Sequence, residues 1–199
     1  CEQQGIYHIS DEAYEYFLYE GAQHYSPASF AGAVGHTISL YSLSKAYGFA
    51  SWRIGYAVFP QDLLTSLLKV QDTNLICPPL ITQMAALGAV QAGKAYCRQP
   101  LLMFEITRRQ VFDRLQQVAD ICEIHPTLGA FYVLLKVKTQ RSDLELSEAL
   151  IKQFHVAVIP GSAFGLQHAC YLRLSFGMLQ PPQMLEAIER LIKGLRALC

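Results

Sequence analysis

The chain has 199 residues, of which 52% are hydrophobic and 16% are charged. This composition is too apolar for a disordered chain, and its apolar stretches are far shorter than the roughly 20 residues of a membrane-spanning helix. Sixteen basic and sixteen acidic residues balance to a net charge of zero, so we expect neither a nucleic-acid partner nor a membrane partner.

The first half of the chain predicts strands followed by helices. Strands are expected at residues 5–10, 37–41 and 53–59, with an aromatic segment at 14–19 and connecting residues at 21–35, where glycine, serine and proline gather. From residue 61 to 76 apolar residues recur at helical spacing, and Pro78-Pro79 ends that helix. A second helical region reaches about residue 119, and we expect it to be broken around Gln99-Pro100.

The second half predicts a small α+β unit. Strands at 124–126, 130–137, 156–159 and 171–176 are separated by helices at 143–154 and 181–197. We therefore expect an α/β protein with two domains, residues 1–110 and 111–199, divided within the long helix.

The six cysteines and six histidines are scattered, without the spacings of a metal site. We expect no bound metal, no signal peptide, reduced thiols and a cytoplasmic protein. Cys1 stands almost directly before the first predicted strand, so we expect the sequence to be part of a longer chain.

A lysine motif follows the strand at 37–41. Lys45 comes after two hydroxyl residues, Ser42 and Ser44, and is followed eight residues later by Arg53 and then by a glycine. A strand that simply ends in solvent would also carry serine and lysine. However, the segment resembles the signature S-x-S-K-x-x-G-x-x-G-x-R-x-G of fold-type I, pyridoxal-phosphate-dependent aminotransferases of class I/II, which are similar to aspartate aminotransferase. Ser51 stands where that pattern has glycine.

Two further segments carry the same resemblance. Asp11 and Tyr14 form a D-x-x-Y element that ends the first predicted strand, at the spacing before the lysine that the family shows. Arg173 lies in Tyr171–Gly177, which resembles the family element R-[IL]-[SC]-[FY]-[GA]. Taken alone, Asp11 could be a turn or cap residue and Arg173 could form a structural ion pair.

The resemblance implies a fold, a cofactor and residue roles. The chain would be the C-terminal portion of such an enzyme: part of a mostly parallel sheet of the large domain, with the strand at 53–59 antiparallel, then a small C-terminal α+β domain. Lys45 would be the catalytic residue and would carry pyridoxal 5'-phosphate as an aldimine. Asp11, Tyr14, Ser42, Ser44 and Arg53 would bind the cofactor, and Arg173 would bind the substrate α-carboxylate.

The resemblance also implies an activity and partners. We expect transfer of an amino group between an L-amino acid and a 2-oxo acid by a homodimer that works in amino-acid metabolism. The motif residues are shared with pyridoxal-phosphate-dependent lyases and synthases, which therefore remain an alternative. A non-catalytic regulator domain of aminotransferase type, or a piece that is inactive by itself, is the other alternative.

Overall fold

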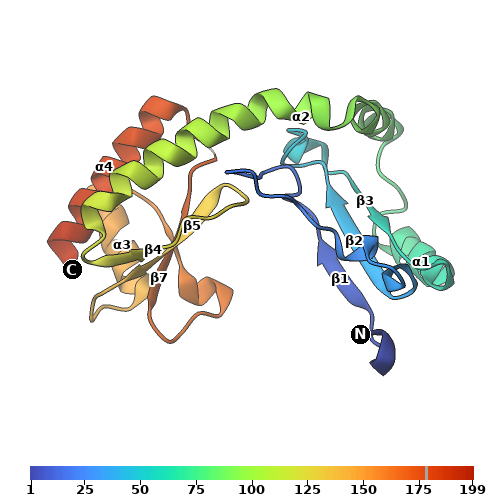
Figure 1. Ribbon diagram of the computed structural model, residues 1–199, viewed down its shortest axis with the longest axis horizontal. Coiled ribbons are helices and arrows are strands. Elements are labelled where there is room, and N and C mark those ends of the chain that lie inside the picture. The colour runs from blue at the N-terminus through green and yellow to red at the C-terminus, as the bar shows by residue number, and fades with distance from the viewer. Residues whose placement is uncertain (178) are drawn as a thin grey trace. The chain divides into compact units, whose positions relative to one another are not determined.

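Figure 1 shows the computed structural model of the chain, which describes residues 1–177 and 179–199, with Gln99 described by its backbone only. The chain forms two compact units, Cys1–Leu101 and Leu102–Cys199. Helix α2 (Leu80–Leu115) continues from the first unit into the second. The domain division expected at residues 110 and 111 also falls within this helix and stays a prediction.

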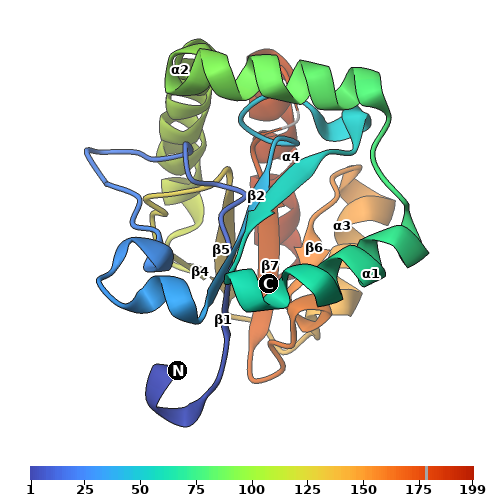
Figure 2. The same cartoon turned by 90° about the vertical axis from the view of Figure 1, so that its right-hand side faces the viewer.

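A three-stranded sheet forms the centre of the first unit. Its strands are β1 (His8–Asp11), β2 (Thr37–Ser42) and β3 (Gly55–Val58), in the order β1-β2-β3. β1 and β2 are parallel and β2 and β3 are antiparallel; the three lie side by side in Figure 1, and Figure 2 views the same sheet from its β3 side. The three predicted strands are thus confirmed, as is the antiparallel direction of the third.

The segment between β1 and β2 contains turns and two short 3-10 helices, Pro27–Ser29 and Ala33–Gly35. Its aromatic part forms a turn and not a helix, and it is held in place by two buried rings. Phe17 is 2% exposed and Tyr19 is 4% exposed, so this turn is fixed to the core of the first unit.

Two helices follow the sheet. α1 (Leu64–Asn74) is preceded by a 3-10 turn at Gln61–Leu63, within the predicted range of 61–76. The break expected at Gln99-Pro100 in the next helix is wrong. α2 passes through Pro100 and is interrupted at Gly93, where φ is 63° and ψ is −155°. Glycine takes a positive φ at little cost because it has no Cβ, whereas the φ of proline is already helical.

The apolar side chains of α1 are only partly covered. Leu68 and Val70 are 58% and 55% exposed. Together with residues of β3, this helix borders a groove of about 520 Å³ that extends to Pro78. The sequence therefore predicted the helix correctly. Its apolar side chains, however, are not fully buried in the described chain.

The second unit is built on a four-stranded sheet in the order β4-β5-β7-β6. Its strands are β4 (Cys122–Ile124), β5 (Tyr132–Val137), β6 (Ile159–Pro160) and β7 (Cys170–Ser175), and all three pairings are antiparallel. Every second residue of β5 and β7 is buried, so one face of the sheet is apolar. The strands expected at 130–137 and 171–176 are confirmed, whereas those expected at 124–126 and 156–159 overlap β4 and β6 by one residue each.

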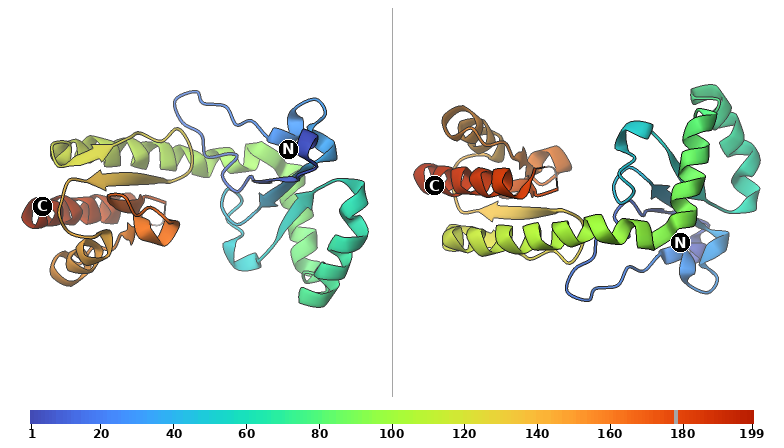
Figure 3. Two further views of the ribbon diagram at one scale, coloured as in Figure 1. Left: turned by 90° about the horizontal axis from the view of Figure 1, so that it is seen from below. Right: turned by 90° about the horizontal axis from the view of Figure 1, so that it is seen from above.

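Helices α3 (Asp143–Phe154) and α4 (Pro181–Leu198) lie side by side on that apolar face, as Figure 3 shows. Gly194 of α4 allows this close packing, because a Cβ there would lie 2.5 Å from the Leu150 side chain. Ser142 begins α3 with a reciprocal capping box to Glu145, and Pro181 begins α4. Both helices match the ranges expected from the sequence.

Within the described residues, no helix is both long enough and apolar enough to cross a membrane. All six cysteines are free thiols, and Cys97, Cys122 and Cys170 are buried. In the same part of the chain, no three His, Cys, Asp or Glu side chains are grouped in a way that could hold a metal ion.

Candidate active site

The carboxyl ends of β1 and β2 bring two of the motif residues to one edge of the sheet. Asp11 ends β1 and pairs in register with Leu40, while Ser42 ends β2 two residues later. Side chains two residues apart on a strand point to the same face. Asp11 and Ser42 therefore lie on the same face of the sheet at the ends of adjacent parallel strands, where ligands of such sheets bind.

Lys45 lies in the turn directly after β2. Its neighbours Leu43, Ala46 and Tyr47 are buried, at 1%, 8% and 7% exposure, whereas Lys45 is exposed. The backbone N–H of Ser44 donates to Ser42 Oγ at 3.2 Å, and the N–H of Phe49 donates to the Leu43 carbonyl at 3.1 Å. The turn is thus anchored by its apolar residues and presents Lys45 outwards.

Arg53 and Gly55 connect this turn to β3. Arg53 has a left-handed backbone, with φ of 52°, and its guanidinium donates to the Ala50 carbonyl at 2.9 Å. Among the described residues no carboxylate pairs with this guanidinium. Ser51 lies in the 3-10 helix Ala50–Trp52 and has no positive φ, so the backbone at this position does not need the glycine of the family pattern.

Asp11 and Tyr14 flank a tight turn. The Asp11 carboxylate accepts the N–H of Ala13 at 3.1 Å, and the residue itself is exposed. The Tyr14 ring meets Phe17 edge to face, with 6.0 Å between the ring centroids. Phe17 is buried, so Tyr14 is held on one side by the core of the unit.

A buried carboxylate network that the sequence did not predict lies behind this turn. The Glu12 side chain is only 1% exposed, accepts a bond from Ser26 Oγ at 2.9 Å, and lies 2.6 Å from His24 Nε2. Burial raises the pKa of the nearby Glu15 carboxyl, His24 opposes that rise, and Glu12 adds to it. His24 and Ser26 lie in the segment 21–35, which the sequence predicted to be a connecting loop. No local sequence pattern indicates that they bind Glu12.

Tyrosines surround the lysine turn. The Tyr47 hydroxyl lies 3.5 Å from that of Tyr16, and the Tyr47 ring stacks on Tyr96 of α2 at 6.0 Å. Burial and the contact with Tyr16 raise the pKa of Tyr47 far above its ordinary value. Tyr47 is therefore a neutral hydrogen-bonding group at neutral pH, and it supports the turn.

Arg173 occupies the face of the second sheet that the helices leave open. It pairs in register with Leu134 of β5 and Ile159 of β6. Its guanidinium lies over the Tyr132 ring at 4.2 Å and over the Phe164 ring at 5.2 Å. Among the described residues no carboxylate forms an ion pair with it, and its Nε is buried without a hydrogen-bond partner. The simple alternative, a structural ion pair, is therefore not what the structure contains.

Phe164 belongs to a short 3-10 helix, Gly161–Phe164, that is fixed from both sides. The buried Asp143 carboxylate at the start of α3 accepts the N–H of Ser162 at 2.5 Å. A Cβ at Gly161 would lie 2.4 Å from that of Tyr171, so only glycine allows this approach to β7. The aromatic neighbour of Arg173 is thus held by a buried hydrogen bond and a close backbone contact.

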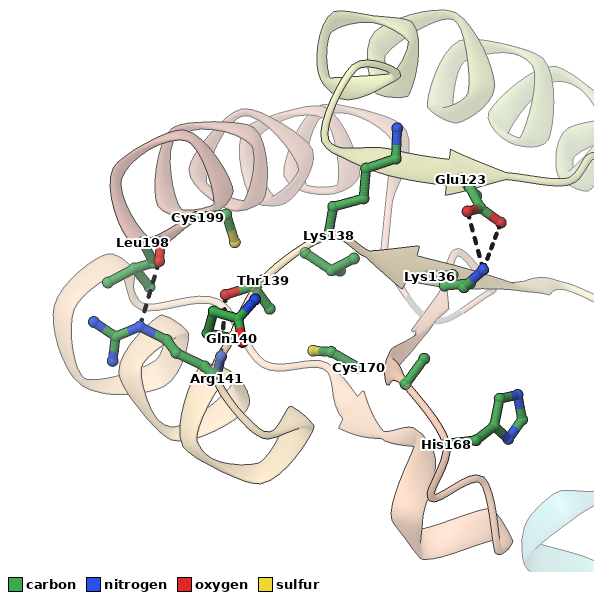
Figure 4. Close-up of a pocket in the computed structure, with 12 residues that line it drawn as sticks. Glu123, Lys136, Lys138, Thr139, Gln140, Arg141, His168, Cys170, Leu198 and Cys199 are labelled. Atoms are coloured by element: carbon green, nitrogen blue, oxygen red, sulfur yellow. Dashed lines mark hydrogen bonds and ion pairs between the residues drawn. The ribbon is translucent and has the colours of Figure 1, made fainter.

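Figure 4 shows a cavity of about 850 Å³ in the second unit, which is lined by none of the motif residues. Its cations already have partners: Lys136 binds both oxygens of Glu123 at 3.0 Å, and Arg141 donates to the Leu198 carbonyl at 3.3 Å. Burial raises the pKa of the Cys170 thiol on its wall to about 11, which leaves it protonated and a poor nucleophile at neutral pH.

The sequence profile of the family described as "Aminotransferase class I and II" matches residues 1–191. The chain belongs to the class I and II aminotransferases. It is 34% identical, over 94% of its length, to an aromatic-amino-acid aminotransferase of Thermococcus litoralis, of which it covers 48%. It is also 34% identical to an aspartate aminotransferase of Pyrococcus abyssi, with the same coverage of both chains. This aminotransferase chain thus spans about half the length of the curated relatives it matches.

Solved structures agree on the α/β fold. An aromatic aminotransferase of Pyrococcus horikoshii superimposes with a TM-score of 0.89 at 31% identity, over 98% of this chain and 52% of that one. The aspartate aminotransferase of Rhizobium meliloti gives 0.90 at 28% identity, over 100% of this chain and 52% of that one. The fold-type I architecture is therefore shown for this aminotransferase chain.

The donor groups of the first unit suit pyridoxal phosphate, the cofactor that the family implies. A carboxylate, a lysine amine, hydroxyl groups and a guanidinium are the partners that a pyridine nitrogen, an aldehyde and a phosphate require. In this aminotransferase chain Asp11, Ser42, Lys45 and Arg53 belong to one unit, and their side chains are half-buried or exposed. The chemistry of the residues therefore fits the cofactor.

Proposed function

We propose that the protein to which this chain belongs is an aminotransferase that moves an amino group between an L-amino acid and a 2-oxo acid, with pyridoxal phosphate bound to Lys45. One observation carries the proposal beyond family membership. Asp11 and Ser42 share a face of the sheet at the ends of adjacent parallel strands, and the lysine turn follows β2 directly. A cofactor seated there would meet a carboxylate, a hydroxyl and an amine from two neighbouring strand ends.

Bound pyridoxal phosphate supplies an electron sink for the negative charge that develops at the substrate Cα. The residues of the chain would then have separate tasks. Lys45 Nζ would carry the proton from the substrate Cα to the cofactor C4′. The Asp11 carboxylate would keep the pyridine nitrogen protonated, and the Tyr14 hydroxyl would donate to the ring oxygen.

Anion binding falls to the remaining residues. Ser42, Ser44 and Arg53 would hold the phosphate; Arg53 lies two residues before β3 and has a left-handed backbone. Arg173 would bind the α-carboxylate in a two-pronged contact, and the bonding capacity of its buried Nε supports this role. Because any amino acid carries that carboxylate, we propose the substrate class and not one amino acid.

The test is reduction of the cofactor-loaded protein with borohydride, followed by peptide mapping and assay of the 2-oxo acid. We expect the label on Lys45 and a 2-oxo acid product from an L-amino acid. Lys45→Ala should lose the label and at least about 10²-fold in turnover, because proton transfer by a placed base contributes 10²–10⁴-fold. Lys69→Ala on α1 is the matched control and should keep both.

Each other outcome has a distinct meaning. A Lys45→Ala protein as active as the wild type would overturn the assignment of the lysine. A label on Lys45 together with loss of carbon dioxide or ammonia, and no 2-oxo acid from the amino donor, would favour a lyase. We also propose a homodimer in the cytoplasm, on family resemblance, which sedimentation and cell fractionation would test.

A further inference from the structure

We propose that Glu12, His24 and Ser26 are positioning residues that hold the end of β1 and so orient Asp11 and Tyr14. The roles of Asp11 and Tyr14 rest on the proposed function. The hold itself rests on contacts within the first unit.

The first step is the cost of burying a carboxylate. Glu12 is 3% exposed, and a buried charge is stable only when it is paired and hydrogen-bonded. Both of its side-chain oxygens have partners: Oε1 accepts from Ser26 at 2.9 Å and Oε2 lies 2.6 Å from His24 Nε2. The partners lie 12 and 14 residues further along the chain, so Glu12 closes the loop between β1 and β2.

The second step is the place of Glu12 at the junction of strand and turn. Its N–H donates to the Leu40 carbonyl at 2.8 Å, which extends the ladder to β2 by one residue beyond β1. Its own carbonyl accepts the N–H of Glu15 at 3.1 Å and so begins the turn that carries Tyr14. Successive side chains of an extended strand point to opposite sides. When the Glu12 side chain is held in the interior, the side chain of the neighbouring Asp11 must therefore point to the exposed side.

The third step is electrostatic. Among the described residues, two acidic groups interact with His24: the Glu12 carboxylate, which bonds to it, and the Glu15 carboxyl, whose pKa is raised by burial. The His24 side chain, which is 33% exposed, thus contacts one carboxyl group and interacts electrostatically with the other. Removing the imidazole would leave Glu12 with Ser26 as its partner and two acidic groups close together.

The consequence for function follows from orientation. Displacement of a catalytic group by about 1 Å can cost roughly 10²-fold in rate even when the change lies outside the chemistry. Asp11 directly precedes Glu12 and Tyr14 lies two residues after it, so a shift of Glu12 moves both. We expect loss of the network to weaken cofactor binding and to alter the environment of the bound cofactor.

The test compares Glu12→Gln, His24→Ala, Ser26→Ala and Ser26→Thr with the wild type. Glu123→Gln, which removes a paired but half-exposed carboxylate in the second unit, is the matched control. Two quantities are measured: amide hydrogen exchange of residues 11–17 in the cofactor-free protein, and the dissociation constant and absorption spectrum of bound pyridoxal phosphate as a function of pH.

We expect faster exchange at the Glu12 and Glu15 amides in the first three variants, a dissociation constant raised about tenfold, and a shifted pH midpoint of the spectrum. Ser26→Thr keeps the hydroxyl and should restore wild-type values, as should the control. Faster exchange with unchanged cofactor binding and spectrum would make the network merely structural and overturn the proposal. Should Glu12→Gln fail to fold, the Ser26→Ala and Ser26→Thr pair decides.

Failure of the proposed function would look different. A wild-type protein without a cofactor adduct on Lys45 overturns the proposed function, whatever the variants do. Unchanged exchange at residues 11–17 in every variant overturns the positioning proposal, whether or not the wild type binds the cofactor.

Discussion

Gly55 lies where β2 and β3 approach each other too closely for a side chain. It pairs with Ser42, and a Cβ on it would lie 2.5 Å from the Tyr41 carbonyl oxygen. Backbone cannot move aside as a flexible side chain can. The register between β2 and β3 therefore explains why the last position of the lysine motif is glycine.

Gly55→Ala should lower the free energy of unfolding by about 1–3 kcal/mol, because the strands must separate to admit the methyl group. Gly88→Ala is the control: no atom lies within 4 Å of a Cβ there, and alanine favours the helix by about 0.5–1 kcal/mol. Urea denaturation of both variants measures the difference. A Gly55→Ala protein as stable as the wild type would show that the strands can separate at little cost.

Glu15 has a consequence for pH dependence. Burial raises the pKa of its carboxyl in the folded protein, so the folded state holds a proton that the unfolded state has already released. Stability from this group therefore falls as pH rises from the unfolded pKa through the raised folded pKa. Above that window, the ionised carboxylate is a constant cost.

Glu15→Gln should thus be more stable than the wild type at pH 7, and the gain should vanish below the ordinary pKa of glutamate. Denaturation at pH 7 and at pH 4 measures both differences. A substitution that destabilises the protein equally at the two pH values would contradict this account and point to a lost hydrogen bond instead.

The motif residues themselves could be found from the sequence because their spacing is local. Lys45, Arg53 and Gly55 belong to one continuous turn and strand, so a pattern of fixed length describes them. Glu12 and its partners could not be found in this way. His24 and Ser26 become partners of Glu12 only when the loop between β1 and β2 folds back, and nothing in their local sequence marks it.

At the scale of elements, α3 and the short helix Gly161–Phe164 depend on one carboxylate. Asp143 lies in the first turn of α3, where negative charge is favourable, and it accepts the Ser162 N–H at 2.5 Å. The bonded segment carries Phe164, whose ring lies against the Arg173 guanidinium. The hydrogen bond between Asp143 and Ser162 thus connects the start of α3 to the segment that contacts Arg173.

Asp143→Ala should cost about 1–3 kcal/mol, because it leaves a buried N–H without an acceptor. Asp143→Asn keeps an acceptor oxygen and should cost less. Glu148→Ala in the same helix removes only an exposed pair with Lys152 and should change stability by less than about 1 kcal/mol. Equal effects of Asp143→Ala and Glu148→Ala in urea denaturation would contradict a special role for Asp143.

The break in α2 shows why element boundaries are hard to read locally. Pro100 was the expected break point because proline lacks an N–H, yet the helix continues through it and turns at Gly93. The position of the bend depends on the direction that the chain takes after it, and the tertiary structure sets that direction.

At the scale of the whole molecule, the two units differ in how well their cores are filled. Most of the largest fully buried side chains belong to the second unit, including Leu135, Leu172 and Ile188, whereas Phe17 and Leu43 represent the first. All four residues of β3 are exposed, and β1 is half-exposed. Local stability follows buried apolar contacts.

Amides of β5 and β7 should therefore exchange hydrogen more slowly than those of β3, by a factor of about ten or more after correction for intrinsic rates. Exchange of the 199-residue chain without cofactor, followed by mass spectrometry, measures this. Equal protection of β3 and β5 would mean that the two units unfold as one cooperative body.

The sequence by itself determined the α/β order of elements, the lysine motif and the family, because periodicity and short motifs are properties of neighbouring residues. Only the tertiary structure decided what lies far apart in the chain. It paired Glu12 with His24 and Ser26, placed Arg173 against two aromatic rings instead of a carboxylate, and moved the bend of α2 to Gly93. These outcomes depend on which distant surfaces are buried together, and burial is set by the folded chain as a whole.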